Sequence, residues 1–64
     1  MKLWIARDKN NGLYLYTRLP SLDYYGTLFN ADHDEYLMLD EDSFPEVTFE
    51  NSPQMVEVKL VKEE

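Results

Sequence analysis

Two short segments of alternating side chains, separated by an Asn-Gly pair, constrain the fold of this chain more than any other feature. "KLWIAR" (2–7) and "LYLYTR" (13–18) alternate with a period of two and contain several aromatic residues. Such alternation with aromatic and β-branched residues is typical of strands. Between the two segments, Asn11 and Gly12 tolerate the positive φ angles that a tight turn needs. We therefore predict a β-hairpin over residues 2–18.

Both faces of this hairpin are apolar or aromatic. One face carries Leu3, Ile5, Leu13 and Leu15, and the other carries Trp4, Tyr14 and Tyr16. Both faces must therefore be covered, either by the connection that follows or by a second copy of the chain. With 64 residues, the chain has a core of a size that rarely supplies more than ~3–5 kcal/mol of net stability. Sheet edges can also pair with another chain, so we expect a homodimer.

A long aromatic and acidic connection follows over residues 19–34. Gly26 interrupts its pattern, and "YGTLF" can add a short edge strand within it. Connections of this length usually have structure or function of their own. We expect Tyr24, Tyr25 and Phe29 to pack over the sheet.

"EYLMLD" (35–40) predicts a third strand, although a single helical turn fits the same residues. We expect the apolar residues of "YLML" to be buried in this strand and the acids around it to mark where it enters and leaves water. "QMVEVKLVK" (54–62) predicts a C-terminal strand with Val56, Val58 and Leu60 on one face.

A turn and a strand are expected between these two strands, over residues 41–50. Asp40 can cap the backbone donors of a short helical turn. Pro45 favours extended geometry at Phe44, which would end that turn. Val47 and Phe49 are then expected on one face of a short extended piece.

The sequence therefore predicts a mainly β fold with little helix, in a single small domain spanning residues 1–64. Its core is a small antiparallel sheet of four to five strands that begins with the hairpin and contains at most one short helical turn. The apolar run Leu3–Ala6 is too short for a signal-peptide core, which needs about 7–15 residues. No segment is long and apolar enough to span a bilayer. We expect a cytoplasmic protein that binds no membrane.

The net charge of −7 is distributed unevenly along the chain. Residues 1–20 carry a net charge of +3, whereas residues 21–57 carry −10 and contain no Lys or Arg. Phosphate contacts need a basic patch, so direct binding of DNA or RNA is not expected. The distribution favours an acidic face toward a basic partner, although solubility alone also explains it. It also suggests that the acidic region of one copy lies near the basic hairpin of another.

The segment "ADHDEYLMLDED" (31–42) raises the question of a metal site. The chain contains no cysteine, which excludes disulfides and thiolate ligands, and His33 is its only histidine. In a strand, His33 would point away from Asp32 and Asp34, and the residue types required by a calcium-binding EF-hand loop do not occur at the required spacing. We predict no metal and no other cofactor.

Catalytic motifs are also missing from the sequence. Ser21, Ser43 and Ser52 do not lie in a nucleophile-elbow pattern, and there is no glycine-rich phosphate loop. Pairs of carboxylates are uninformative, since 13 acidic residues guarantee that some pair lies at a suitable distance. We expect a protein that is not an enzyme and has no catalytic residues.

The strings "LWIARD", "GLYLY", "FPEVTFENSP" and "VEVKL" together resemble short uncharacterised open reading frames of gut anaerobic bacteria and their phages. The similarity covers residues 2–18 and 44–60 and leaves 19–43 unmatched. No activity is assigned to that group, so the resemblance transfers no role to any residue. It implies an intracellular bacterial or phage setting.

These features favour a protein–protein interaction or regulatory module without catalysis, whose protein partner the sequence does not identify. The alternative is a phage-type acidic DNA mimic, in which carboxylates replace phosphates against the basic groove of a nucleic-acid-binding host protein. Exposed aromatic residues are typical interface anchors, although core packing explains the same residues. The candidate interaction surface comprises Trp4, Tyr14, Tyr16, Tyr24, Tyr25, Asp32, Asp34, Glu35, Asp40, Glu41 and Asp42.

Overall fold

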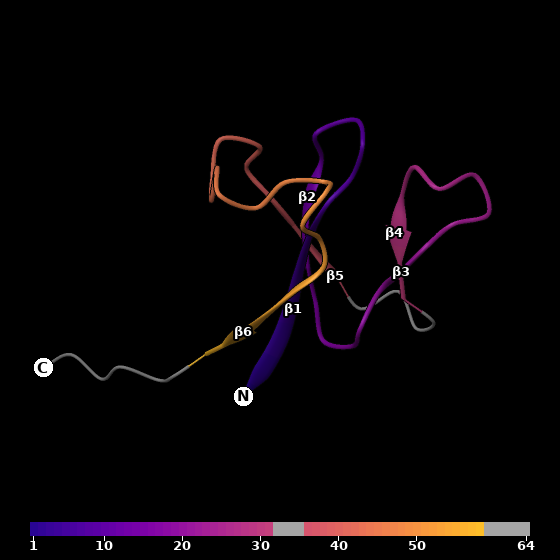
Figure 1. Ribbon diagram of the computed structural model, residues 1–64. Coiled ribbons are helices and arrows are strands. Elements are labelled where there is room, and N and C mark those ends of the chain that lie inside the picture. The colour runs from indigo at the N-terminus through magenta and orange to yellow at the C-terminus, as the bar shows by residue number, and fades with distance from the viewer. Residues whose placement is uncertain (32–35, 59–64) are drawn as a thin grey trace, which may run out of the picture.

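The computed structural model describes residues 1–31 and 36–58, and Figure 1 shows their arrangement. The described residues form strands and no helix: β1 (Lys2–Arg7), β2 (Leu13–Tyr16), β3 (Ser21–Leu22), β4 (Phe29–Asn30), β5 (Tyr36–Leu39) and β6 (Gln54–Glu57). A four-stranded antiparallel sheet has the order β5-β2-β1-β6, and β3 and β4 form a separate two-stranded sheet. The predicted mainly β fold is confirmed. No helix that could cross a membrane occurs in the described part of the chain.

The predicted hairpin is confirmed, and β1 pairs with β2 so that Trp4 lies opposite Tyr16. In its turn, the amide of Asp8 donates to the carbonyl of Gly12 at 2.7 Å. Asn11 adopts a φ of 79°, as its residue type allows. At Gly12 a Cβ atom would lie 3.1 Å from a ring carbon of Tyr14, so this ring would have to shift slightly to make room for a larger residue.

The pairing gives the four-stranded sheet two distinct faces. We call one the leucine face; it carries Leu3, Ile5, Leu13, Leu15, Leu37, Leu39 and Val56. We call the other the tyrosine face; it carries Trp4, Ala6, Tyr14, Tyr16 and Tyr36. The sheet also has two ends: the hairpin end, where β1 turns into β2, and the open end, where β1 begins. A different segment of the chain covers part of each face.

Residues 40–53 cross the leucine face at its hairpin end, on the way from β5 at one edge to β6 at the other. Val47 is buried there against Ile5 and Leu13. In Figure 1 this orange segment lies beside the violet turn between β1 and β2. Among the described residues, no segment crosses the open half of the leucine face in this way.

The β3–β4 sheet stands on the other side and covers part of the tyrosine face (Figure 1). Phe29 of β4 is buried with Ala6 and Tyr16, and its ring lies 6.0 Å from that of Phe49. The connection over 19–34 therefore contributes two short strands to the fold. Of the three aromatic residues expected to pack over the sheet, only Phe29 does so. Tyr24 and Tyr25 are 97% and 81% exposed, because they occupy the turn between β3 and β4.

Three further predictions about local structure are corrected. Most of "YLML" is not buried: Tyr36, Leu37 and Met38 are exposed, with Leu37 at 60% and Met38 at 70%, whereas Leu39 is partly buried against the core of the leucine face. Residues 41–50 form turns and contain no strand. Val47 and Phe49 join the cores on opposite faces of the sheet and do not share one.

The backbone between β5 and Pro45 also differs in part from expectation. Asp40 does cap a turn, since its Oδ1 accepts a hydrogen bond from the amide of Asp42 at 3.0 Å. Phe44, however, has a φ of 49° and is not extended. This conformation directs its carbonyl, like that of Ser43, to the Arg7 guanidinium.

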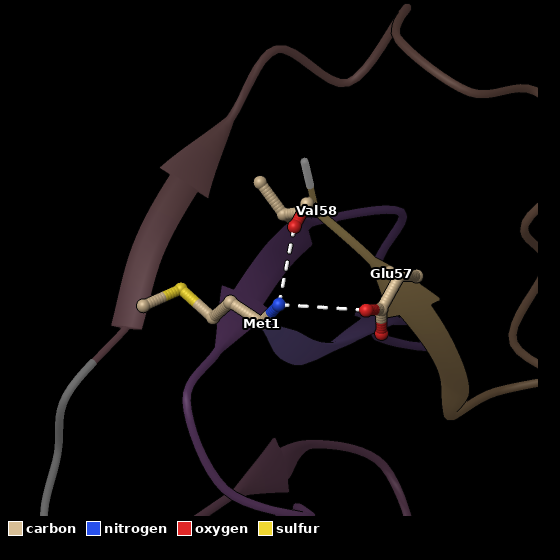
Figure 2. A network of polar contacts seen from close by, with 3 residues as sticks. All are labelled: Met1, Glu57 and Val58. Atoms are coloured by element: carbon tan, nitrogen blue, oxygen red, sulfur yellow. Dashed lines mark hydrogen bonds and ion pairs between the residues drawn. The ribbon is translucent and has the colours of Figure 1, made fainter. Parts of the chain in front are cut away.

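Strand β6 pairs with β1 beyond the last ladder residues. Figure 2 shows the amino group of Met1, which donates to the carbonyl of Val58 at 3.1 Å and lies 3.5 Å from Glu57 Oε1. The amide of Val58 returns a bond to the Met1 carbonyl at 2.8 Å. The predicted C-terminal strand is thus seen over its first part, and residues 59–62 lie outside the described residues.

Candidate interaction surface

Arg7 is the last residue of β1 and holds the 40–53 segment against the leucine face. Its side chain is buried, and its Nε donates to the carbonyl of Val47 at 2.5 Å. The two terminal nitrogens donate to the carbonyls of Asn11, Glu41, Ser43 and Phe44 at 2.9 to 3.2 Å. One guanidinium therefore satisfies five backbone carbonyls from two loops.

These contacts leave no donor of Arg7 for a ligand. A guanidinium has no acceptor, and each of its N–H groups already has a backbone partner here. A cavity of about 460 Å³ lies at this end of the molecule, with Arg7, Lys9, Glu41 and Glu50 among its lining residues. The guanidinium of Arg7 is the most obvious anion-binding group in this cavity, but its donors are already bound to backbone carbonyls.

Asp8 follows Arg7, points to the opposite face of the sheet and holds the β3–β4 sheet. It is 5% exposed, and its Oδ1 accepts a hydrogen bond from the amide of Phe29 at 2.8 Å. Burial raises the pKa of Asp8, the Phe29 amide lowers it in part, and the nearby charge of Asp23 raises it further. Among the described residues the only ion pair joins Met1 and Glu57, so Asp8 has no cationic partner there.

Three tyrosines form a cluster next to Asp8. Tyr14 and Tyr16 are two residues apart on β2 and so share a face, and Tyr36 lies opposite Tyr16 on β5. Their ring centroids are 5.5 to 6.4 Å apart, and the rings of Tyr14 and Tyr36 are nearly perpendicular at 81°. Burial, together with the charge of Asp8, raises the pKa of Tyr16 to about 12. Its hydroxyl donates to the carbonyl of Phe29 at 3.0 Å.

The open half of the leucine face forms an apolar depression. It has a volume of about 310 Å³ and is lined chiefly by Leu3, Leu15, Tyr36 and Leu37. Strand β5 forms one border of this depression and is an edge strand, since no described strand pairs with its outer side. Tyr36, Leu37 and Met38 are all exposed on this strand. An exposed apolar edge next to an apolar depression is suited to binding another polypeptide.

The aromatic residues proposed from the sequence do not form one surface. Trp4 and Tyr14 are half-buried and Tyr16 is buried, all on the tyrosine face. Tyr24 and Tyr25 lie on the turn of the β3–β4 sheet, with their rings perpendicular to each other and 5.5 Å apart. Core packing therefore accounts for the positions of Trp4, Tyr14 and Tyr16, whereas Tyr24 and Tyr25 are exposed at the surface.

The proposed acidic residues divide in a similar way. Asp40, Glu41 and Asp42 are exposed at the hairpin end of the sheet, directly after β5. Asp32, Asp34 and Glu35 lie outside the described residues, as does His33. Among residues 1–31 and 36–58, no three acidic or histidine side chains gather as metal ligands would.

Sequence reasoning missed Asp8 and the residues of β5 as candidate site residues. Asp8 looked like the charged end of the first strand, and its contact with Phe29 spans 21 residues. Tyr36, Leu37 and Met38 looked like core because they form an apolar run. A signal was present, because acidic residues flank this run on both sides and edge strands are often flanked by charge.

Comparison of this chain with protein-family models, curated proteins and solved structures finds no match.

Proposed function

We propose that this protein is a protein-interaction module that acts without catalysis and binds a protein partner along β5 and the open half of the leucine face. The observation that carries the proposal is the exposure of three consecutive large apolar residues, Tyr36, Leu37 and Met38, on an edge strand. Soluble proteins usually protect such edges with charge, proline or a covering segment. Tyr36–Leu39 contains no charged residue and no proline. No described strand pairs with its outer side.

The opposite edge of the sheet provides a comparison. Strand β6 is preceded by Pro53 and contains the charged Glu57. Strand β5 itself contains neither a proline nor a charged residue. The contrast supports a partner at β5 in particular, and not at sheet edges in general.

Charge indicates which kind of partner strand fits. Asp40, Glu41 and Asp42 follow β5, and Asp32, Asp34 and Glu35 precede it in the sequence. The β5 strand of a second copy would bring like charges together in either orientation, which is unfavourable. An apolar partner strand flanked by Lys or Arg is therefore favoured. A homodimer in which the acidic region meets the basic hairpin remains a separate proposal.

The experiment compares two substitutions of the same residue type. Leu37→Lys places a charge on the proposed surface, and Leu19→Lys is the matched control, because Leu19 is also 60% exposed but lies outside this surface. Each tagged protein is used to capture partners from lysate of the native host at low and at high salt, with quantitative mass spectrometry. We expect a partner that wild type and Leu19→Lys retain and that Leu37→Lys loses by about tenfold, or about 1.4 kcal/mol.

Equal capture by both variants would contradict the proposal. Capture of a nucleic-acid-binding protein that depends on low salt and is indifferent to Leu37→Lys would instead favour the acidic DNA mimic. Sedimentation of the purified wild-type protein tests the homodimer directly.

A further inference from the structure

A second pocket lies on the tyrosine face, between the four-stranded sheet and β4. It has a volume of about 260 Å³, and Asp8, Tyr14, Tyr16, Phe29 and Tyr36 are among its lining residues. Drug-sized ligands occupy pockets of ~300–1,000 Å³, so this pocket suits a small group or one end of a side chain. Its walls are unusual in composition, since three tyrosine rings surround a region that also contains a buried carboxylate.

The contacts within the fold involve only one of the two oxygens of the Asp8 carboxylate. Only its Oδ1 accepts a hydrogen bond from a described residue, namely the amide of Phe29. No Lys, Arg or His nitrogen of the described residues lies within ion-pair distance of it. The one charge that acts on it, Asp23, has the same sign. A buried carboxylate without a cation is costly, and its position in a pocket lets a ligand supply the missing charge.

The tyrosine rings reinforce the preference for a cation. The face of an aromatic ring carries negative potential, and cations are attracted to it within about 6 Å of the centroid. Tyr14 and Tyr36 are in edge-to-face contact at 81°, and Tyr16 is tilted by 45° and 46° relative to them. All three rings line the pocket, and clustered aromatic rings recognise ammonium groups.

We propose that this pocket binds an alkylammonium cation, with Asp8 as its counter-charge and Tyr14, Tyr16 and Tyr36 as aromatic walls. A hard metal ion fits less well, since Ca²⁺ and Mg²⁺ need about six oxygen ligands and Asp8 is the only carboxylate of the lining. The ammonium group belongs either to a free small amine or to a lysine side chain of another protein. The proposal does not rest on the proposed function, because Asp8 and Tyr14 lie outside the β5 surface and only Tyr36 is common to both sites.

The test is an NMR titration of the whole chain with n-butylammonium chloride and with Nα-acetyl-lysine methylamide. Neutral 1-butanol controls for hydrophobic binding, and sodium chloride controls for ionic strength. We expect saturable shifts at Tyr14, Tyr16 and Tyr36 with both amines and none with sodium chloride. Tighter binding of the lysine derivative would indicate a protein side chain as the source, and equal or weaker binding would indicate a free amine.

Matched variants locate the binding. Asp8→Asn keeps an oxygen for the Phe29 amide, so the fold is retained, and binding should weaken by about tenfold through loss of the charge. Glu46→Gln makes the same change of net charge at an exposed position outside the pocket and should bind as wild type does. Tyr36→Leu should weaken binding by about two- to fivefold.

Three results would overturn the proposal: shifts as large with 1-butanol as with the amines, an Asp8→Asn protein that binds as well as wild type, or no saturable shift with either amine. The amide spectrum of each variant establishes that it is folded before titration.

Discussion

Arg7 and Asp8 are neighbours in the chain, yet each anchors a different covering segment on a different face of the sheet. The guanidinium holds 40–53 on the leucine face through backbone carbonyls, and the carboxylate holds β4 on the tyrosine face through a backbone amide. In both cases the buried charge contacts main-chain groups and has no opposite charge among the described residues as a partner. Loss of either side chain therefore leaves buried backbone groups without a partner, which is costly.

Substitution of Arg7 by lysine tests whether the shape of the side chain matters in addition to its charge. An ammonium has fewer donors and cannot match the planar fork of the guanidinium, so some carbonyls of 40–53 would lose their partner. We expect the free energy of unfolding to fall by about 2–3 kcal/mol, measured by urea denaturation. Arg18→Lys, at an exposed position, is the control and should change it by less than about 0.5 kcal/mol. Similar free energies of unfolding for the two variants would show that the guanidinium contacts of Arg7 contribute little to stability.

Asp8 makes the stability of the fold depend on pH. Its pKa in the folded protein is raised above the usual 3.8, chiefly by burial, so the folded state favours the protonated form. The stabilisation of the fold that results from this pKa shift is fully present below pH 3.8, and it is lost as the pH rises through the folded-state pKa. Asp8→Asn should therefore unfold at higher urea concentration than wild type at pH 7, and the difference should vanish at low pH. A variant less stable than wild type at pH 7 would show that the Phe29 contact outweighs the burial of the charge.

At the scale of elements, local signals were sufficient for β1, β2, β5 and β6, although they wrongly predicted a strand within 41–50. Contacts distant in sequence decided the burial of the strands. The hairpin follows from alternation and an Asn-Gly turn, all within 17 consecutive residues. The burial of β5 depends on where the crossing segment lies. That position is set by Arg7, more than 30 residues before the carbonyls of Glu41, Ser43 and Phe44 that it binds. Backbone carbonyls carry no residue-type signal, so no sequence pattern marks them as partners.

Contacts distant in sequence also explain why the candidate site could not be predicted from the sequence. The three clustered tyrosines could be placed on one face only once Tyr36 was paired with Tyr16, which depends on the register between β2 and β5. Register is determined by burial of one face, and the apolar run of β5 offers either face. The acidic residues were visible in the sequence, but Asp8, whose carboxylate is the one that is buried among the described residues, lies outside the acid-rich region.

The Tyr16→Phe substitution tests how the β3–β4 sheet is attached to the four-stranded sheet. The variant loses the hydrogen bond to the Phe29 carbonyl in a buried position, at a cost of about 1–2 kcal/mol. We expect faster hydrogen exchange at the amide of Phe29 while amides between β1 and β2 remain protected. Tyr14→Phe removes a hydroxyl from the neighbouring ring and should leave the exchange of Phe29 unchanged. Equal acceleration in both variants would mean that the hydrogen bond from Tyr16 to Phe29 does not hold the β3–β4 sheet in place.

At the scale of the whole molecule, the two ends of the sheet differ in how completely they are covered. Arg7, Asp8 and the crossing segment hold the hairpin end together, whereas the open end leaves the depression around Leu37 accessible. The residues that hold the covering segments and the proposed partner surface around Leu37 therefore lie at different ends of the sheet. Substitutions on the open end should affect partners more than folding, which is the basis for choosing Leu37→Lys as a probe.

The contacts of Arg7 have a consequence for how the sequence of this protein can vary. Because the guanidinium binds main-chain oxygens, it places no requirement on the side chains of Glu41, Ser43 or Phe44. The crossing segment can therefore exchange its exposed side chains during evolution while keeping its path across the sheet. A single arginine fixed in the scaffold thus allows the surface above it to diversify without loss of the fold.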